Sequence, residues 1–278
     1  MRLTLLSMPC AAGVAAARVL LAADEHEVVS VVMAGTEVAD DPVAAEAEQH
    51  GVPVQWVGRA TVAEAVRQDQ PDLVAVACFP WLLRPDVLAI PRLGGVNLHP
   101  SLLPALRGPE PVFWAYRNGL RVTGVTVHLL DGAFDHGAVV AQAAVPIPAG
   151  SRGDDLEAQL MEIGAALLLE ALPAFAAGRL VAAPQDEARA SLAPSPAPAD
   201  WVVTSLLPAA WAWQFVRGVA HLGGPLVVQA GGRTIPVLDA VAFDPEERIS
   251  IAVHEEADGD VTVRFAQGWV RFVPRRGA

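Results

Sequence analysis

Lysine is absent from this chain of 278 residues, and its nineteen basic residues are all arginines. Thirty-one acidic residues outnumber them, so the formal net charge is −12. Proteins that bind polyanions usually carry a basic surface, because neutralising phosphates supplies much of their affinity. The acidic balance therefore disfavours a nucleic acid partner, although neighbouring arginines such as Arg117 and Arg121 would allow a small local patch.

Cysteine is also scarce, and the pattern of potential metal ligands is poor. Cys10 and Cys78 are far apart in sequence, without the spacing of a metal site or the even-numbered framework of a small disulfide-rich domain. His221 and His254 have no neighbours at metal-ligand spacing. We therefore expect two reduced thiols and no metal site.

Long apolar runs and nucleotide-binding loops are missing as well. No uninterrupted apolar run reaches the ~18 residues that span a bilayer. The apolar N-terminus is broken by Pro9 and Arg18, which favours a strand entering a helix over a leader peptide. The first turn, residues 7–13, has neither the glycine fingerprint for dinucleotides nor a phosphate-binding P-loop. These features predict a cytoplasmic protein with no membrane partner, and they disfavour NAD and ATP as ligands.

The residues that are present predict a globular α/β protein. Residues 2–8 and 26–33 are β-like runs, and the alanine- and leucine-rich residues 11–23 between them are helical in character. A strand, a helix and a second strand in this order predict a parallel βαβ unit. Further helices are predicted at 40–50 and at 61–68, the latter with Thr61 as N-cap, and a buried strand at 72–78. The pattern indicates a Rossmann-like, mostly parallel sheet.

The last third of the chain changes character. Residues 181–200 are rich in alanine, proline and serine and lack a hydrophobic period, as in a linker. A helix at 206–219 and five short strands then predict a small, partly closed β-barrel. The expected strands are 225–229, 234–243, 249–254, 261–266 and 269–273. We therefore expect a catalytic domain at 1–180, a linker at 181–200 and a small barrel domain at 201–278.

Polar side chains that could carry chemistry gather between Gly94 and Gly137. Asn97 and His99 stand two apart at the end of a predicted strand, so they share one face of it. Pro100 cannot donate a ladder hydrogen bond and ends the strand there. In open α/β sheets this carboxyl edge is where ligands bind. Further along, a loop from Asp131 to Gly137 carries two carboxylates among turn-forming residues.

A longer pattern connects these positions to a known family. Asn97-x-His99-x-Ser101-Leu102-Leu103-Pro104-x-x-x-Gly108, followed by Asp135-x-Gly137, closely resembles the folate-dependent formyltransferases. These include methionyl-tRNA formyltransferase, the sugar-nucleotide formyltransferases and, more distantly, glycinamide ribonucleotide formyltransferase. The resemblance implies that the donor substrate is 10-formyltetrahydrofolate. It also implies that the C-terminal barrel is OB-like, as in the methionyl-tRNA enzymes.

The resemblance also implies roles for individual residues. Asn97, His99 and Asp135 match the catalytic trio of the family, and Ser101, Leu102, Leu103 and Pro104 match its folate-adjacent loop. The apolar loop with Phe79, Trp81 and Leu82 would wall the pterin pocket, together with Asp131, Gly132, Ala133 and Phe134. Formyl transfer to an amine needs a donor aimed at the developing oxyanion and groups that move two protons. Asn97 and His99 suit the first need, and His99 with Asp135 the second.

Two further histidines have different expectations. His128 lies in the middle of a predicted strand and is read as a structural histidine. His136 follows Asp135, where relatives often carry a small residue or Thr. It is either solvated or in contact with the acceptor or the folate tail.

More than one acceptor amine is compatible with the sequence. The acidic charge and the short loop between Gly35 and Val43 favour a small amine: an amino sugar nucleotide, an amino acid or a hydroxylamine. Methionyl-tRNA is the first alternative. A formyltetrahydrofolate hydrolase or a non-catalytic folate-binding module is the second. The sequence leaves the oligomeric state open, a homodimer being one option.

Overall fold

The computed structural model describes residues 1–275, and these divide into two compact units. The first unit contains Met1–Pro111, Val122–Pro146 and Glu157–Leu192. The second takes in Val112–Arg121 and Ile147–Leu156 as well as the chain from Ala193 onward. Each unit therefore contains segments that are separated in sequence.

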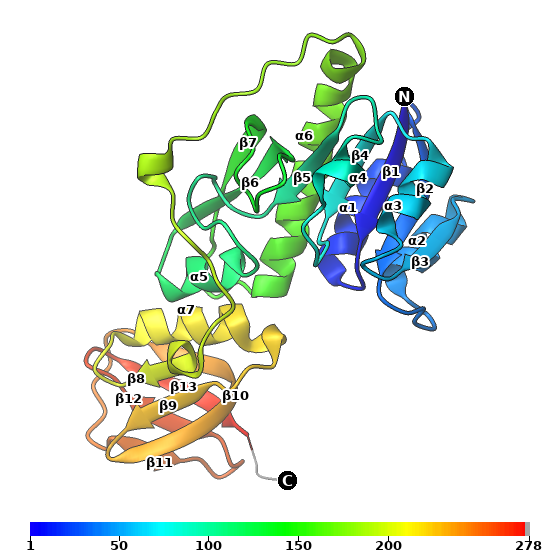
Figure 1. The fold of residues 1–278 in the computed structure, drawn as a ribbon. Helices are drawn as coiled ribbons and strands as arrows, with labels where there is room; N and C mark the ends of the chain where they lie inside the picture. Colours follow the sequence, from blue (N-terminus) through cyan, green and yellow to red (C-terminus); the bar gives the residue numbers. More distant parts are fainter. Residues whose placement is uncertain (276–278) are drawn as a thin grey trace. The chain divides into compact units, whose positions relative to one another are not determined.

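The first unit is built on a seven-stranded sheet with helices between its strands (Figure 1). Its strands are β1 (Arg2–Ser7), β2 (Glu27–Ala34), β3 (Val54–Val57), β4 (Leu73–Ala77), β5 (Gly95–His99), β6 (Val122–Leu129) and β7 (Val139–Pro146). Its helices are α1 (Ala11–Leu21), α2 (Pro42–Gln49), α3 (Val62–Asp69), α4 (Pro85–Leu88) and α6 (Gly153–Ala176), of which α6 begins in a segment of the second unit.

The strand order β3-β2-β1-β4-β5-β6-β7 is that of a Rossmann-like sheet with an antiparallel extension. The first five strands run parallel, and β6 and β7 are each antiparallel to their neighbours. This confirms the predicted mostly parallel α/β sheet. Because β5 is parallel to β4 and antiparallel to β6, the end of β5 lies beside residues of both.

Alternate residues of the strands point into two separate cores, one on each face of the sheet. Leu5, Met33 and Ala75 belong to a core with α1, α2 and α6. Leu6, Val32 and Val76, each adjacent in sequence to one of those three residues, belong to a core with α3 and α4. Strands buried on both faces explain why the sequence shows continuous apolar runs here and not alternation.

Helix α6 is long and apolar enough, by length and composition alone, to cross a membrane. The helix continues through its acidic residues for 24 residues, so it is longer than any uninterrupted apolar run in the sequence. Leu160, Met161, Ala165 and Leu168 of this helix are completely buried, and three of them lie in the core with α1 and α2. Its apolar character is thus explained by packing against the sheet.

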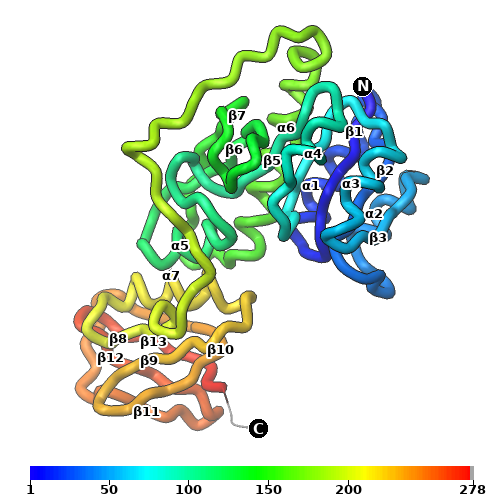
Figure 2. The backbone as a smooth tube through the Cα atoms, viewed as in Figure 1, coloured from blue at the N-terminus to red at the C-terminus, as the bar shows by residue number. Residues whose placement is uncertain are grey.

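After α6 the chain continues as an extended segment of residues 181–192, which we call the strap (Figure 2). Ala183 of the strap pairs with Val139 of β7 through two backbone hydrogen bonds of 2.8 Å. Further on, Arg107 N donates to the carbonyl oxygen of Ser191 at 2.8 Å. The strap includes a short 3-10 helix, Glu187–Arg189, and leads to a second one, Pro198–Trp201.

The second unit carries a six-stranded sheet with the order β11-β12-β13-β10-β9-β8. The strands are β8 (Val202–Thr204), β9 (Val227–Ala230), β10 (Arg233–Asp244), β11 (Val253–Glu255), β12 (Val261–Arg264) and β13 (Trp269–Pro274). Helices α5 (Pro111–Arg117) and α7 (Ala209–Val219) and a 3-10 helix, Ala220–Leu222, complete it. A second, mostly antiparallel sheet is therefore confirmed. No ladder joins β8 to β11 within residues 1–275, so closure into an OB-like barrel is not confirmed.

Aromatic rings from three segments form the core of the second unit. Phe113 of α5 lies 4.9 Å from Trp201 and 5.6 Å from Phe215 of α7, measured between ring centroids. Tyr116 packs so closely on Gly218 that a Cβ there would come within 2.2 Å of its ring. Glycine at 218 thus lets α5 and α7 approach each other.

Candidate active site

The strand β5 presents Asn97 and His99 on one face at the carboxyl end of the parallel sheet, as predicted. His99 is the last residue of the strand and is buried. Its Nε2 donates to the Leu106 carbonyl oxygen at 2.8 Å. Because a carbonyl only accepts, this bond places the proton on Nε2 of the neutral ring. Nδ1 is then left with its lone pair directed towards Asp135, whose Oδ1 lies 3.5 Å away.

His128 of β6 lies opposite Asn97 in the antiparallel ladder and is completely buried. Its Nδ1 donates to the Leu129 carbonyl oxygen at 2.9 Å, which makes Nε2 the acceptor of the neutral ring. Asn97 Nδ2 donates to that Nε2 at 3.1 Å. This histidine, which the sequence favours as structural, therefore fixes the orientation of the Asn97 amide.

Asp135 brings the carboxylate that completes the cluster. Its Oδ2 accepts a hydrogen bond from the Gly108 backbone amide at 2.8 Å. Its Oδ1 lies 3.4 Å from Asn97 Nδ2, 3.5 Å from His99 Nδ1 and 3.6 Å from His128 Nε2. Strong hydrogen bonds to oxygen are shorter than ~3.2 Å, so all three contacts are loose. Catalytic hydrogen bonds are often long before a substrate binds.

The electrostatics of the cluster keep His99 neutral and Asp135 ionised. Burial lowers the pKa of His99 below the ordinary 6.5, although the Asp135 carboxylate and the Leu106 carbonyl oppose the shift. Burial alone would raise the pKa of Asp135, but the His128 and His99 rings, to the extent that they take up a proton, and the Gly108 amide together bring it below the ordinary 3.8. At neutral pH the site therefore combines a carboxylate with an imidazole whose Nδ1 can accept a proton.

The predicted folate-adjacent loop is held from inside the protein. Ser101 is completely buried, and its Oγ donates to the Ala105 carbonyl oxygen at 2.7 Å. Leu103 N donates to Thr126 Oγ1 at 3.1 Å, and Gln142 Nε2 donates to the Leu103 carbonyl oxygen at 2.9 Å. The Leu103–Pro104 peptide bond is cis. Leu102 packs against Gly124, where a Cβ would come within 2.4 Å of it. These contacts fix the loop between His99 and Gly108. The backbone amide of Gly108 in turn donates to the Asp135 carboxylate.

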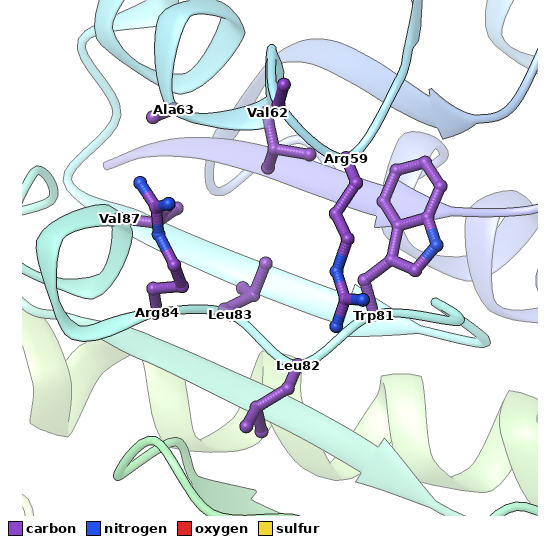
Figure 3. Close-up of a pocket in the computed structure, with 9 residues that line it drawn as sticks. Arg59, Val62, Ala63, Trp81, Leu82, Leu83, Arg84 and Val87 are labelled. Atoms are coloured by element: carbon purple, nitrogen blue, oxygen red, sulfur yellow. The ribbon is translucent and has the colours of Figure 1, made fainter.

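The apolar loop after β4 lines a cavity of about 410 Å³. Trp81 and Leu82 contribute to its wall, and the Phe79 and Trp81 rings meet edge to face at 5.3 Å. Figure 3 shows Arg59 extending beside Trp81, with Arg84 and Val87 across the cavity. Arg84 is paired with Asp86 at 2.6 Å, whereas Arg59 has no acidic partner within residues 1–275. The sequence pointed to the apolar wall and missed the two arginines.

The loop from Asp131 to Phe134 is more exposed to solvent than the catalytic cluster. Asp131 Oδ1 accepts from the Ala133 backbone amide at 3.0 Å, while Gly132 adopts a positive φ of 86°. Phe134 leaves 60% of its surface exposed, so its ring is free to contact a ligand. His136 is engaged by Asp131, with Nδ1 2.5 Å from Oδ2. It also lies 3.5 Å from Glu187 of the strap, so it is neither simply solvated nor part of the cluster.

Sequence reasoning missed residues whose partners are distant in the chain. His128 is 31 residues from Asn97. Gln185 of the strap bonds to the backbone of the Asp135 loop, 50 residues away. Within residues 1–275, no three or more His, Cys, Asp or Glu side chains come together in a way that could hold a metal ion.

Comparison with known proteins identifies relatives of this arrangement. A family model described as formyl transferase matches residues 15–172, which include Asn97, His99 and Asp135. A methionyl-tRNA formyltransferase from Chloroflexus aurantiacus is 42% identical over 202 residues, which cover 69% of this chain and 64% of that protein. The chain thus matches a little under two thirds of that relative's length.

Solved structures share the architecture. A glycinamide ribonucleotide transformylase from Symbiobacterium toebii has a TM-score of 0.58 at 27% identity, covering 67% of this chain and 94% of that one. An N-formyltransferase from Helicobacter canadensis, in complex with folinic acid and dTDP-3-aminofucose, has a TM-score of 0.70 at 13% identity. It covers 99% of this chain and all of its own, so the fold of both units has a counterpart there.

Proposed function

Because the chain belongs to the formyl transferase family, we propose that it transfers a formyl group from 10-formyltetrahydrofolate to an amine. The observation that carries the proposal is the cluster at the end of β5, where Asp135 Oδ1 lies 3.4 Å from Asn97 Nδ2 and 3.5 Å from His99 Nδ1. It supplies a hydrogen-bond donor, a neutral base and a carboxylate in one buried place, and these are the groups that the reaction requires.

The chemistry balances with these groups. The acceptor nitrogen forms a bond to the formyl carbon, the bond from that carbon to the folate nitrogen breaks, and one proton passes from the acceptor to the folate nitrogen. Negative charge develops on the formyl oxygen during the attack. The second Nδ2 hydrogen of Asn97, held only loosely by Asp135, is free to donate to that oxygen. His99 Nδ1 can accept the amine proton, and the Asp135 carboxylate stabilises the resulting imidazolium.

The residues around the cavity after β4 fit a folate. A flat heteroaromatic ring is held by apolar walls, and Trp81, Leu82 and Leu83 supply such walls. The glutamyl tail of a folate carries carboxylates, and Arg59 is a cation at the same cavity with no acidic partner among the described residues. We assign Phe79, Trp81 and Leu82 to the walls and add Arg59 and Arg84 as partners of the tail.

The acceptor that the relatives favour is methionyl-tRNA. The Chloroflexus aurantiacus protein carries that name at 42% identity, whereas the charge of this chain had favoured a small amine. We therefore propose methionyl-tRNA first. A small amine such as an amino sugar nucleotide is the second candidate, favoured by the net charge of −12 and by the short loop between Gly35 and Val43.

A competition assay decides between them. The protein is incubated with 10-formyltetrahydrofolate and a mixture of methionyl-tRNA, amino sugar nucleotides and hydroxylated diamino acids. Mass spectrometry then reports which amine gains the mass of one CO unit. Methionyl-tRNA with its amine already acetylated and the Asn97→Ala protein serve as controls. Formylated tRNA supports the first candidate, and a formylated small amine replaces it by the second. Formate released with no labelled amine would refute transfer and favour the hydrolase.

A further inference from the structure

The catalytic carboxylate stands on a backbone that needs outside support. Asp135 has a φ of 52°, in the left-handed region that a residue with a Cβ rarely adopts. Such conformations are unfavourable and persist where the surroundings over-determine them. The Gly108 amide holds the side chain, but it does not hold the main chain of the loop.

The strap supplies that support through Gln185. One nitrogen, Gln185 Nε2, donates to the carbonyl oxygen of Asp135 at 2.9 Å and to that of Gly137 at 2.8 Å. The two carbonyls stand on either side of His136, so the amide bridges the turn that carries the carboxylate. Gly137 also lies against β6, since a Cβ there would be 1.8 Å from the Leu129 carbonyl oxygen.

Arg107 fixes which way the Gln185 amide points. Its Nε and Nη2 donate to Gln185 Oε1 at 3.1 and 2.7 Å. Because a guanidinium only donates, Oε1 must face Arg107, and Nε2 must then face the two carbonyls. Glu187 of the strap accepts from the same guanidinium at 2.7 and 2.9 Å, and Arg107 is buried. The charge that orients the amide is therefore itself held in place.

The strap also reaches the loop that holds His99. Ser191 Oγ accepts from Leu106 N at 2.9 Å, and the Leu106 carbonyl oxygen is the acceptor of His99 Nε2. Ser191 N donates to the Pro104 carbonyl oxygen at 3.1 Å. One extended segment thus contacts the supports of both His99 and Asp135.

We propose that Gln185, oriented by Arg107, is a positioning residue that sets the distance between the Asp135 carboxylate and His99. The inference rests on the proposed function in taking Asp135 as catalytic. Gln185 Nε2 donates to main-chain carbonyl oxygens and not to the Asp135 carboxylate, so it acts through the backbone of the Asp135 turn. Its effect is to hold the Asp135 carboxylate at a fixed distance from the His99 imidazole, which must accept a proton.

The first test needs no substrate. Gln185→Met keeps the length and neutral charge of the side chain and removes its hydrogen bonds. The ionisation of His99 is followed by NMR of histidine-labelled protein, with the signal assigned by its loss in His99→Asn. The Asp135 carboxylate raises the pKa of His99, so a displaced carboxylate lowers that pKa further. The control, Gln68→Met on the exposed face of α3, leaves it unchanged. An unchanged His99 pKa in Gln185→Met overturns the proposal.

The second test is kinetic. The acceptor is the amine that the competition assay identifies. With it, kcat of Gln185→Met falls by about tenfold or more, because a misplaced catalytic group slows the reaction. KM for the folate stays within about threefold. Should Gln185→Met fail to fold, Arg107→Lys retains the charge, loses the fork to Gln185 and moves both readouts in the same direction. A lowered pKa with unchanged kcat overturns the role in the reaction. An inactive wild-type protein refutes the proposed function. The NMR result then still tests whether Gln185 sets the position of the Asp135 carboxylate relative to His99.

Discussion

The amide of Asn97 divides its two hydrogens unequally. One is bound to His128 Nε2 at 3.1 Å, and the other faces Asp135 Oδ1 at 3.4 Å. The first bond fixes the plane of the amide, so the second hydrogen is held ready without a strong partner of its own. Preorganised donors of this kind lower a barrier because they need no reorientation during the reaction.

Removing this donor is predicted to slow catalysis while leaving the fold intact. Asn97→Ala should reduce kcat by ~100-fold or more, since one oxyanion donor contributes about 3 kcal/mol. Single-turnover formylation measures the rate, and circular dichroism with thermal unfolding serves as the control. A variant that is folded and as fast as the wild type would contradict the oxyanion role.

The depressed pKa of His99 predicts a stability that depends on pH. The folded protein holds His99 neutral, whereas the unfolded chain takes up its proton near the ordinary 6.5. This residue therefore contributes its full stability above that value, and the contribution is lost as the pH falls through 6.5 towards the folded pKa. Urea unfolding of the wild type and of His99→Gln should show a free-energy difference that shrinks from about pH 7 to about pH 5. A difference independent of pH would contradict the assignment.

Arg59, which has no acidic partner in the described part of the chain, leads to a prediction about the folate tail. Arg59→Met should raise KM for 10-formyltetrahydrofolate by about two- to fivefold with kcat unchanged, because exposed ion pairs contribute up to about 1 kcal/mol. Arg67→Met, on an exposed face of α3, is the matched control. The ratio between the two variants should shrink in high salt. Equal KM values for both would exclude Arg59 from the tail site.

At the residue scale, only relations between residues close together in the chain could be predicted from the sequence. Asn97 and His99 share a strand face two residues apart, and strand geometry alone places them together. His128 meets Asn97 only because β6 pairs with β5 in one particular register, and nothing in its neighbourhood reveals that register. Gln185 stands in a stretch whose composition indicates a linker, and its bonds form across 50 residues.

At the scale of elements, a glycine at position 164 lets helix α6 pack closely against β5 and β6. A Cβ on Gly164 would come within 2.7 Å of Val125 Cγ2 and 3.4 Å of Leu98, the residue between Asn97 and His99. Val125 is completely buried and its β-branched side chain is stiff. Glycine is a poor helix residue by about 1 kcal/mol, so its presence here reflects packing.

Gly164→Ala is therefore predicted to destabilise the protein although alanine favours the helix. Overpacking costs about 1–3 kcal/mol, which exceeds the gain in helix propensity in most of that range. Combining it with Val125→Ala should make the double variant more stable than the sum of the two single effects. Denaturant unfolding measures all three. A stabilised single variant would show that the contact relaxes without strain.

The elements themselves were largely predictable where the signal is a local period. The helix expected at 61–68 is observed as Val62–Asp69, and the strand expected at 72–78 as Leu73–Ala77. Thr61 does stand before α3, but its Oγ1 bonds to Gly58 and not to the helix, since the turn from Gly58 uses the hydroxyl first. The short strand β8 was missed because three residues after a proline-rich stretch carry no period.

At the scale of the whole molecule, the second unit depends on segments from the middle of the chain. Phe113 and Tyr116 are buried by Trp201, Phe215 and Gly218. A fragment ending at Leu192 would expose both rings, and each buried aromatic contributes about 2–3 kcal/mol. The fragment should melt at a lower temperature than the full chain and bind a hydrophobic dye. Phe113→Ser with Tyr116→Gln should reduce the dye binding of the fragment, and a fragment that binds none would contradict this account.

Interleaved segments also restrict how such a protein can evolve or be engineered by recombination. Since Val112–Arg121 and Ile147–Leu156 group with the chain that follows Ala193, a single crossover after the strap would unite an α5 from one parent with an α7 from another. The close approach of Tyr116 to Gly218 would then have to be matched by chance. A chimera that exchanges the C-terminal part must carry both inserted segments with it. Shuffling libraries built on this fold are therefore expected to yield folded members mainly when three pieces are inherited together.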